Sequence, residues 1–472
     1  MKREKNLVKN TMIITIGKVF TQLITFFLLP LYTAVLSTAD YGIVDLLNTL
    51  IALLIPIASL QIEQALFRFL IDNRENESEK KNIISTSFFL VVAQVILYLG
   101  IFCIIAPFLN NNYKYFLATN VIACMLSNVF LQIARGLGDN KTYSIGCFIT
   151  ALVTIILNVL FLVVFKWGAS GMLLANLIGN IACILYVFIV LKLNRYISKE
   201  KYDSDMVKRL CKYSMPLIPN SISWWIFNSS DRIIVTSFLG IAQTGILSVS
   251  YKFSGIYITI YNIFNMTWTE TASLHINDVD RDEFFSNIIN KCLALFGSIC
   301  LGIISIMPFI FPIMINEKFN EAYNQIPILM LASLFNVIVG LISVIYIAKK
   351  DTKSVARTSV LAAILNIIIN LALVKIIGLY ASSISTLVAY SFIAFYRIYD
   401  VKKYVKIKLD SKFVLSTVLL TIALFVGYYM NYLYLNIALF LLTIIYCFVI
   451  NKDSIDLIIN ILKKKKAGAN NE

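Results

Sequence analysis

Residues 322–348 read AYNQIPILMLASLFNVIVGLISVIYIA, a run of 27 positions without a charged side chain. A helix rises about 1.5 Å per residue, so this run is long enough to cross the roughly 30 Å hydrocarbon core of a bilayer. Lys349 and Lys350 follow it directly. The pattern predicts a transmembrane helix that ends in a basic loop.

The rest of the chain repeats this pattern. Its 472 residues are 59% hydrophobic and 14% charged, with a mean hydropathy of +0.80. This composition excludes a water-soluble globular protein, because most of the apolar surface would face solvent. Cutting the sequence at its polar breaks gives fourteen candidate spans: 10–36, 40–67, 83–107, 115–135, 143–165, 171–192, 213–239, 245–274, 284–314, 322–348, 358–377, 379–397, 413–430 and 436–450. We therefore expect an all-α membrane protein of about fourteen transmembrane helices.

The distribution of basic residues predicts the topology. Most Lys and Arg fall in every second loop, and the opposite loops hold only Lys114, Lys166, Lys318 and Lys375. Cytoplasmic loops are enriched in this way, so the net charge of +15 is read as topology rather than nucleic-acid binding. We predict a multi-pass protein of the cytoplasmic (inner) membrane, with both termini cytoplasmic and the first span retained rather than cleaved.

Loop lengths and a short internal sequence repeat predict the domain organisation. We expect an N-lobe (1–192, spans 1–6), a cytoplasmic linker (193–212), a C-lobe (213–397, spans 7–12), a C-terminal helix pair (413–450) and a cytoplasmic tail (451–472). Residues 36–43, LSTADYGI, are echoed at an offset of 203 by residues 239–246, LGIAQTGI. Two six-span halves would be related by a parallel pseudo-twofold axis, and their rocking would give alternating access.

Three segments resemble a known family. They are LLPLY (28–32) with DYG (40–42), YSMPLIP (213–219), and SDRIIV (230–235) with FLG (238–240) and Gly245. They are similar to the polysaccharide flippases of the multidrug/oligosaccharidyl-lipid/polysaccharide exporter superfamily, over essentially the whole chain. The resemblance implies a MATE-like pair of six-helix lobes around a V-shaped, cation-lined cavity, and a lipid-diphosphate-linked oligosaccharide as cargo. Peptidoglycan-precursor flippases and drug exporters share this architecture.

Charged side chains inside spans point to a binding site, because each costs about 2.5–3.5 kcal/mol on insertion scales and so faces a cavity or a partner. Asp231 and Lys252 are equidistant from the turn between spans 7 and 8, which predicts an ion pair. If Asp231 takes Lys252, Arg232 is left over, and Lys18 has no carboxylate at matching depth in its own hairpin because Glu63 lies further toward the cytoplasm. Asp45 is expected near the outer edge, with Arg232 deeper. We predict that Lys18, Arg232 and Lys252 bind the cargo diphosphate. The alternative is that these charges pair across helices and hold the bundle together.

Acidic side chains near the cytoplasmic edge are candidates for ion coupling. Glu63 and Glu270 fall there, and each either pairs with basic loop residues or binds a coupling ion. Together with Asp231 they form the predicted ion-pair and coupling set.

The middle of span 7 carries a candidate sugar site. Trp224 and Trp225 could stack on sugar rings while the Asn228 amide binds hydroxyls, and helix packing is an equally weighted alternative. Pro216 and Pro219 near the start of this span should bend it and give a hinge.

Signatures of enzymes are missing from the sequence. It has no Walker A motif, nucleophile elbow or dinucleotide loop, and its eight cysteines lack metal-ligand spacing. We therefore expect no enzyme activity and no cofactor, and a sugar polymerase or ligase would need a large extracytoplasmic loop that the sequence lacks. The predicted function is a flippase for undecaprenyl-diphosphate-linked oligosaccharides in surface polysaccharide synthesis. The alternatives are a cation-coupled multidrug exporter and a peptidoglycan-precursor flippase. We expect a monomer whose partners are the lipid-linked cargo, membrane lipids, and the polymerase and glycosyltransferases of the same route.

Overall fold

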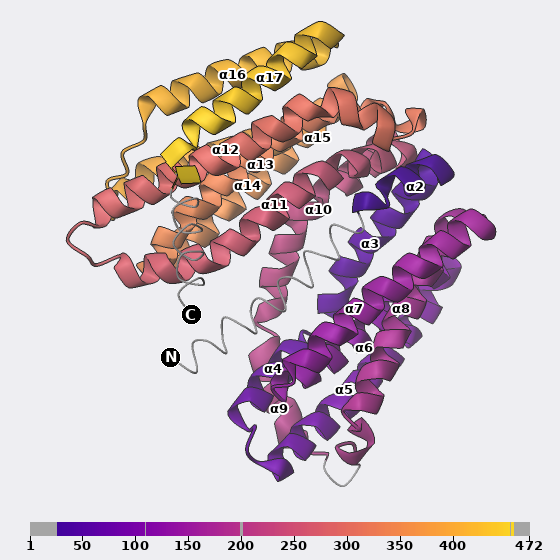
Figure 1. Cartoon of the computed structure of the whole chain (residues 1–472). Coiled ribbons are helices and arrows are strands. Elements are labelled where there is room, and N and C mark those ends of the chain that lie inside the picture. The colour runs from indigo at the N-terminus through magenta and orange to yellow at the C-terminus, as the bar shows by residue number, and fades with distance from the viewer. Residues whose placement is uncertain (1–25, 109, 199–201, 454, 457–472) are drawn as a thin grey trace, which may run out of the picture. The chain divides into compact units, whose positions relative to one another are not determined.

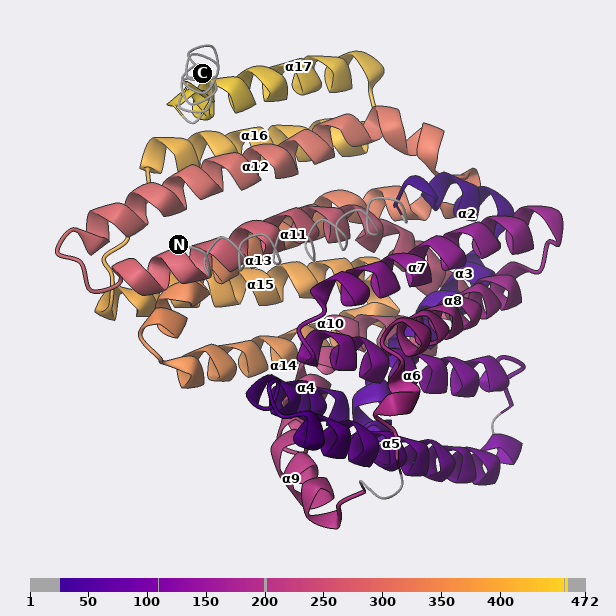
Figure 2. The same ribbon diagram turned by 60° about the horizontal axis from the view of Figure 1, so that its bottom comes forward.

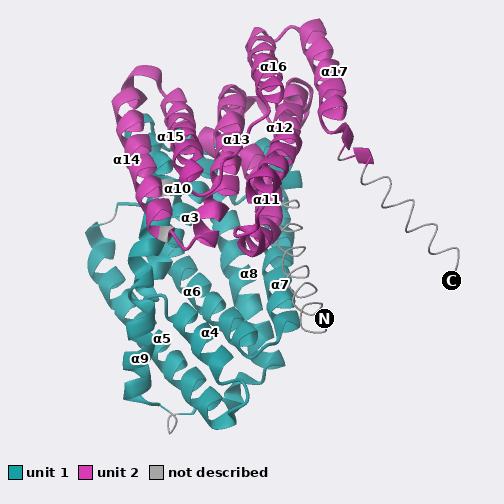
Figure 3. Ribbon diagram, turned by 90° about the vertical axis from the view of Figure 1, so that its left-hand side faces the viewer, with its two compact units in different colours: residues 1–245 teal, residues 246–472 magenta. Residues whose placement is uncertain are grey.

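The protein is all-helical. The computed structural model describes residues 26–108, 110–198, 202–453 and 455–456, and no strand occurs among them (Figure 1). The predicted all-α fold class is confirmed. The described chain divides into two compact units, Met1–Gly245 and Ile246–Glu472, which are described separately (Figure 3). The lobe boundaries predicted from the loops stay a prediction.

Unit 1 packs its helices around α4 and α6. The helices are α2 (Leu29–Val35), α3 (Thr38–Ala58), α4 (Ile62–Asp72), α5 (Glu77–Ile105), α6 (Lys114–Gly136), α7 (Asn140–Val159), α8 (Gly168–Val190), α9 (Ser204–Ser214), α10 (Leu217–Leu239) and the first residues of α11. A π-helical turn, Leu160–Val164, extends α7. Leu66, Ile84 and Val129 belong to an apolar core that joins α4, α5 and α6.

Unit 2 contains the remaining helices. They are most of α11 (Ile241–His275), then α12 (Arg281–Met314), α13 (Glu321–Ala348), α14 (Thr352–Ile377), α15 (Tyr380–Asp400), α16 (Ser411–Met430) and α17 (Leu433–Ile450). α13, α14 and α15 pack against one another, and α12 packs against α13.

Side-chain caps mark several of the helix starts. The Ser37 hydroxyl accepts a hydrogen bond from the backbone N–H of Asp40 at 3.0 Å, and Asn76, Asp139 and Asp351 cap α5, α7 and α14 in the same way. Each cap satisfies backbone donors that have no partner within the helix. The polar residues that interrupt the apolar runs therefore also define where the helices begin.

The helices have the length and composition of a multi-pass membrane protein. Ten of the described helices are long and apolar enough to cross a bilayer. Three further predicted spans coincide with α10, α11 and α15, which are not among those ten, and most of the first predicted span lies outside the described residues. The total of fourteen spans therefore stays a prediction.

The predicted span 40–67 is wrong as a single helix. The chain breaks at residues 59–61, between α3 and α4, where Leu60 and Gln61 have left-handed backbones with φ of 49° and 56°. Non-glycine residues rarely take this conformation. The two prolines of predicted span 7 also lie at a helix start: Pro216 caps α10 and Pro219 is in its first turn, after α9 ends at Ser214.

The last two helices form a hairpin along α12 (Figures 1 and 2). At its beginning the backbone N–H of Asp410 donates to the Asn290 side chain at 3.1 Å. At its turn Tyr428 stacks on Tyr323 of α13, with ring centroids 4.1 Å apart. At its end Asn451 donates to the Ser298 hydroxyl at 2.8 Å.

Candidate functional site

Two polar contacts join α3 and α10 within unit 1. The Arg232 Nε donates to Asp45 Oδ2 at 2.6 Å. The Trp225 indole N–H donates to the backbone carbonyl of Thr49 at 2.7 Å. Thr49 lies one turn after Asp45 on α3, whereas Trp225 lies two turns before Arg232 on α10. The two helices therefore run antiparallel where they meet.

The ion pair corrects the expectation that Arg232 is left over as a surplus cation. The two side chains are each 18% exposed, so the pair is largely shielded from solvent. The guanidinium also donates from Nη1 to the carbonyl of Asn228 at 3.1 Å. Residue counting had put Asp45 near the outer edge and Arg232 deeper, but the antiparallel register of α3 and α10 brings them to one level.

The other two predicted phosphate ligands, Lys18 and Lys252, are not part of this contact between α3 and α10. Lys18 lies outside the described residues. Lys252 lies on α11 in unit 2, whereas Asp231 is buried on α10 in unit 1. Their ion pair stays a prediction.

The predicted sugar-binding residues lie on two faces of α10. Trp225 and Arg232 are seven residues apart and share the face that meets α3. Trp224 and Asn228, four residues apart, share another face, and the Asn228 amide donates to the Trp224 carbonyl at 2.7 Å. The Trp224 side chain is 59% exposed. Trp225 thus packs against α3, and Trp224 and Asn228 are the pair with exposed surface.

The two predicted coupling carboxylates differ in their surroundings. Glu63 is buried in the first turn of α4, directly after the break from α3. Glu270 is exposed on α11 of unit 2. Only the first has the burial that an internal ion site requires.

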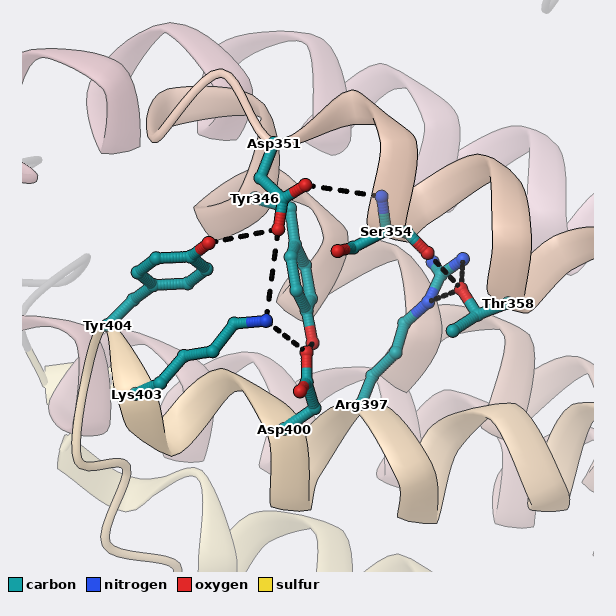
Figure 4. Close-up of polar contacts among 8 residues, drawn as sticks. All are labelled: Tyr346, Asp351, Ser354, Thr358, Arg397, Asp400, Lys403 and Tyr404. Atoms are coloured by element: carbon teal, nitrogen blue, oxygen red, sulfur yellow. Dashed lines mark hydrogen bonds and ion pairs between the residues drawn. The ribbon is translucent and has the colours of Figure 1, made fainter.

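Sequence reasoning missed the burial of Arg397 by counting it among the loop residues. It is 2% exposed on α15, and its guanidinium donates to the Thr358 hydroxyl (Figure 4). It also donates to the Ser359 and Ser343 hydroxyls and to a backbone carbonyl of α14. The signal was available: three hydroxyl residues, Ser343, Thr358 and Ser359, sit at the ends of the two neighbouring spans.

A second polar group adjoins Arg397 at the same end of α15. Tyr346 donates to Asp400 at 2.8 Å, and Lys403 lies 2.9 Å from that carboxylate. Tyr404 donates to Asp351 at 2.9 Å (Figure 4). These contacts tie the ends of α13, α14 and α15 together.

Metal-binding clusters are not found in the described part of the chain. No group of three or more His, Cys, Asp or Glu side chains gathers there. The eight cysteines are free thiols.

The sequence matches one family profile over more than half of its length. Residues 7–269, more than half of the chain, match the profile of a family described as polysaccharide biosynthesis protein. No curated protein sequence matches the chain.

Solved structures of membrane transporters are similar to this one. A multidrug resistance MATE family transporter of the MOP superfamily, in its inward-facing conformation, has a TM-score of 0.65 at 11% identity, over 82% of this chain and 98% of that chain. The lipid II flippase MurJ, in its inward closed conformation, has a TM-score of 0.64 at 21% identity, over 94% of this chain and all (100%) of that chain. At such identities the likeness shows a shared fold.

Proposed function

This chain belongs to the polysaccharide biosynthesis protein family, and from that premise we propose that it is a flippase for undecaprenyl-diphosphate-linked oligosaccharides. In this proposal it acts in the cytoplasmic membrane, as a monomer and without enzyme chemistry, and supplies repeat units for surface polysaccharide. The two halves, related by a pseudo-twofold axis along the membrane normal, would rock against each other and expose the cargo site to each leaflet in turn.

The observation that carries the proposal is the largely buried ion pair of Arg232 with Asp45. An arginine inside a membrane protein requires an anion, because an uncompensated charge in a low-dielectric interior is costly. Asp45 supplies that anion between transport cycles. A diphosphate offers the planar guanidinium a forked set of charged acceptors, so it is a competitor for the same donors.

The exchange of one anion for another gives a mechanism for loading and release. When the diphosphate takes Arg232, the Asp45 carboxylate gives up this ion pair. When the cargo leaves, Asp45 closes on Arg232 again. Both states keep the arginine compensated.

The remaining predicted ligands fit around this exchange. Lys18 and Lys252 would add point charges to the diphosphate. Trp224 and Asn228, which share the partly exposed face of α10, would contact the sugar. Trp225 would hold α10 against α3 rather than touch the cargo.

An exchange of charges across the pair tests the proposal. In a strain deleted for the gene, we would compare wild type with Arg232→Ala, Asp45→Ala and the double variant R232D with D45R. The double variant keeps an ion pair between α3 and α10 but moves the guanidinium to α3. We expect it to restore protein level and thermal stability relative to the single variants, yet to leave surface polysaccharide near the level of the deletion.

A matched control comes from an exposed pair on α4. Arg68 and Asp72 are 2.8 Å apart and about half exposed, so R68D with D72R should export normally. Normal export by R232D with D45R would mean that the pair is only a packing contact and would overturn the diphosphate role. Drug tolerance conferred by the wild type, without flipping of a lipid-diphosphate sugar in proteoliposomes, would overturn the proposed cargo.

A further inference from the structure

The break between α3 and α4 gathers a small polar cluster inside unit 1. Ser59 is at its centre. Its hydroxyl accepts from the backbone N–H of Gln61 at 3.1 Å, and Glu63 follows two residues later in the first turn of α4. Its backbone carbonyl accepts from the Gln94 amide of α5 at 3.1 Å. The left-handed Leu60 and Gln61 interrupt the helix and leave the Ser59 carbonyl accessible to Gln94, because in a continuous helix that carbonyl would accept from the N–H of Glu63.

Two oxygens of this cluster are buried without a partner. Glu63 is 5% exposed and Gln94 is 7% exposed. Within the described part of the chain, neither Glu63 Oε2 nor Gln94 Oε1 has a hydrogen-bond partner. Gln94 donates to the Ser59 carbonyl, and Glu63 begins α4 directly after the break, so both side chains belong to the same interruption of the helix. Buried polar atoms are nearly always paired, so such a pair of exceptions calls for an explanation.

The surroundings make the cluster a poor place for a lone negative charge. Ile62 and Leu66 flank Glu63 on α4, Val91 lies one turn before Gln94 on α5, and all three are fully buried. Apolar walls of this kind strongly disfavour an uncompensated carboxylate.

Charged groups on the elements packed against α4 are engaged elsewhere. Arg135 of α6 lies over Phe67, and Arg209 of α9 lies over Phe69. Arg68 pairs with Asp72 on α4 itself. These contacts all fall at least one turn beyond Glu63 toward the end of α4. The other charged groups on the three packed helices are Glu77, Glu79, Lys80 and Lys81 of α5, Lys114 of α6, and Asp205, Lys208 and Lys212 of α9. The uncharged titratable groups on the same helices are Tyr98, Cys103, Tyr115, Cys124, Cys211 and Tyr213. No ion pair reaches Glu63 within the described residues.

We propose that Glu63, Ser59 and Gln94 form a binding site for an exchangeable monovalent cation, H⁺ or Na⁺. The shared chemistry is one positive charge delivered to the Glu63 carboxylate. All the available ligand atoms are oxygens, which suit a hard cation: a carboxylate, an amide oxygen and a hydroxyl. A broken transmembrane helix that presents such groups is a known way to build an ion site in a membrane protein.

This site gives the proposed flippase a place for coupling. Cation binding at Glu63 does not depend on the cargo, but its use to drive transport rests on the proposed function. The site lies where α3 gives way to α4, and α3 also carries Asp45, so occupancy of the break and the anion exchange at Arg232 act on one helix.

Binding is tested on the purified full-length protein, without cargo. For Na⁺, we would measure the thermal unfolding midpoint at fixed pH while NaCl replaces choline chloride. For H⁺, we would record the infrared band of a protonated carboxylic acid at neutral pH in Na⁺-free buffer. The variants are Glu63→Gln, Gln94→Leu and Glu75→Gln; Glu75 is an exposed residue in the loop after α4 and is the matched control.

The expected result distinguishes the two cations. If the ion is Na⁺, NaCl stabilises wild type and E75Q but not E63Q, and Q94L needs about tenfold more Na⁺ for the same shift. If it is H⁺, wild type and E75Q show the acid band, E63Q loses it, and NaCl has no specific effect. Equal behaviour of wild type and E63Q in both measurements would overturn the site. If E63Q does not fold, Q94L and Ser59→Ala keep the carboxyl and must still change the Na⁺ response or shift the acid band.

A transport measurement then separates this site from the cargo proposal. In proteoliposomes carrying a lipid-diphosphate sugar, E63Q should lose the dependence of flipping on the cation gradient while retaining slow, gradient-independent flipping. A wild type that binds the cation but flips no such cargo would overturn the proposed function and leave the cation site intact.

Discussion

Gly42 of α3 and Gly245 of α11 approach each other so closely that a methyl group on either would collide with the other helix. A Cβ atom on Gly42 would lie 2.9 Å from the backbone nitrogen of Gly245, and one on Gly245 would lie 2.8 Å from that of Gly42. The first would also strike the carbonyl of Ile241, and the second that of Thr38. Thr38 and Gly42 differ from Ile241 and Gly245 by 203, the offset of the repeat predicted from sequence. The contact thus has two-fold character.

We predict that Gly42→Ala destabilises the protein. Backbone atoms cannot move aside as a flexible side chain can, so the added methyl group should cost about 1–3 kcal/mol as overpacking. The measurement is the thermal unfolding midpoint in detergent, followed by size-exclusion chromatography. Gly100→Ala is the control, because nothing lies within 4 Å of a Cβ at that helical glycine. It should be neutral or stabilise the protein, and equal behaviour of the two variants would contradict the close contact.

Removing the Trp225 hydrogen bond should weaken the α3–α10 contact. Trp225→Phe loses the N–H that donates to the Thr49 carbonyl and should cost about 1 kcal/mol. Trp224→Phe, at an exposed position of the same helix, should leave the unfolding midpoint unchanged. If Trp224 contacts sugar, W224A should lower flipping while stability stays at the wild-type value. A stability loss of the same size in W224F and W225F would show that the two tryptophans do not differ in this way.

The guanidinium of Arg397 should resist even conservative replacement. Lysine keeps the charge but cannot reach hydroxyls of α13 and α14 at once, so Arg397→Lys should cost about 2–3 kcal/mol by leaving buried groups unpaired. The readout is the yield of monodisperse protein together with its unfolding midpoint. Arg357→Lys, at an exposed position on α14, is the matched change. Wild-type stability of R397K would refute the role of the hydroxyl cage.

The polar group at the ends of α13, α14 and α15 should make stability depend on pH. Hydrogen bonds from Ser354 and then Tyr404 lower the pKa of Asp351. A hydrogen bond to Asp400 raises the pKa of Lys403. A lowered carboxyl pKa means that the folded state binds its proton less tightly than the unfolded chain. Its stabilising effect is present above about pH 4 and is lost as the pH falls further.

The sign is opposite for the lysine. The stabilising effect of Lys403 is complete below about pH 10.4, the pKa of a lysine in the unfolded chain. It is lost as the pH rises through the higher pKa of Lys403 in the folded state. We therefore expect a plateau of the unfolding midpoint between these limits. Asp351→Asn should flatten the acid side and Lys403→Gln the alkaline side, whereas Asp453→Asn, at an exposed carboxyl, should change neither. An acid side that D351N leaves as steep as in wild type would refute the assignment.

The helices could be predicted from the sequence because a long apolar segment is stable in a bilayer as a helix. Lipid offers no hydrogen-bond partners to the backbone N–H and C=O groups of residues 322–348, so these groups must pair with one another in a helix. α13 covers this stretch almost residue for residue. The interruption at Leu60 and Gln61 was not accessible, since neither position carries the Gly or Asn that usually signals a left-handed backbone.

The partner of Arg232 was missed for a different reason. Counting residues from a loop gives the depth of a side chain within its own span, but not which spans are neighbours. Asp45 and Arg232 are 187 residues apart and meet through the packing of two helices that are not consecutive. Arg397 was missed because a basic residue at a span end reads as a loop residue, and only the packing of α13 and α14 around it shows that it is buried.

The hairpin of α16 and α17 returns the chain to the part of α12 from which it departs. Asp410 contacts Asn290, and Asn451 contacts Ser298, two turns further along α12. The hairpin thus crosses the membrane twice, so the residues that follow it lie on the same side as the residues that precede it. A reporter fused after Lys408 and one fused after Asn451 should therefore emerge on the same side of the membrane.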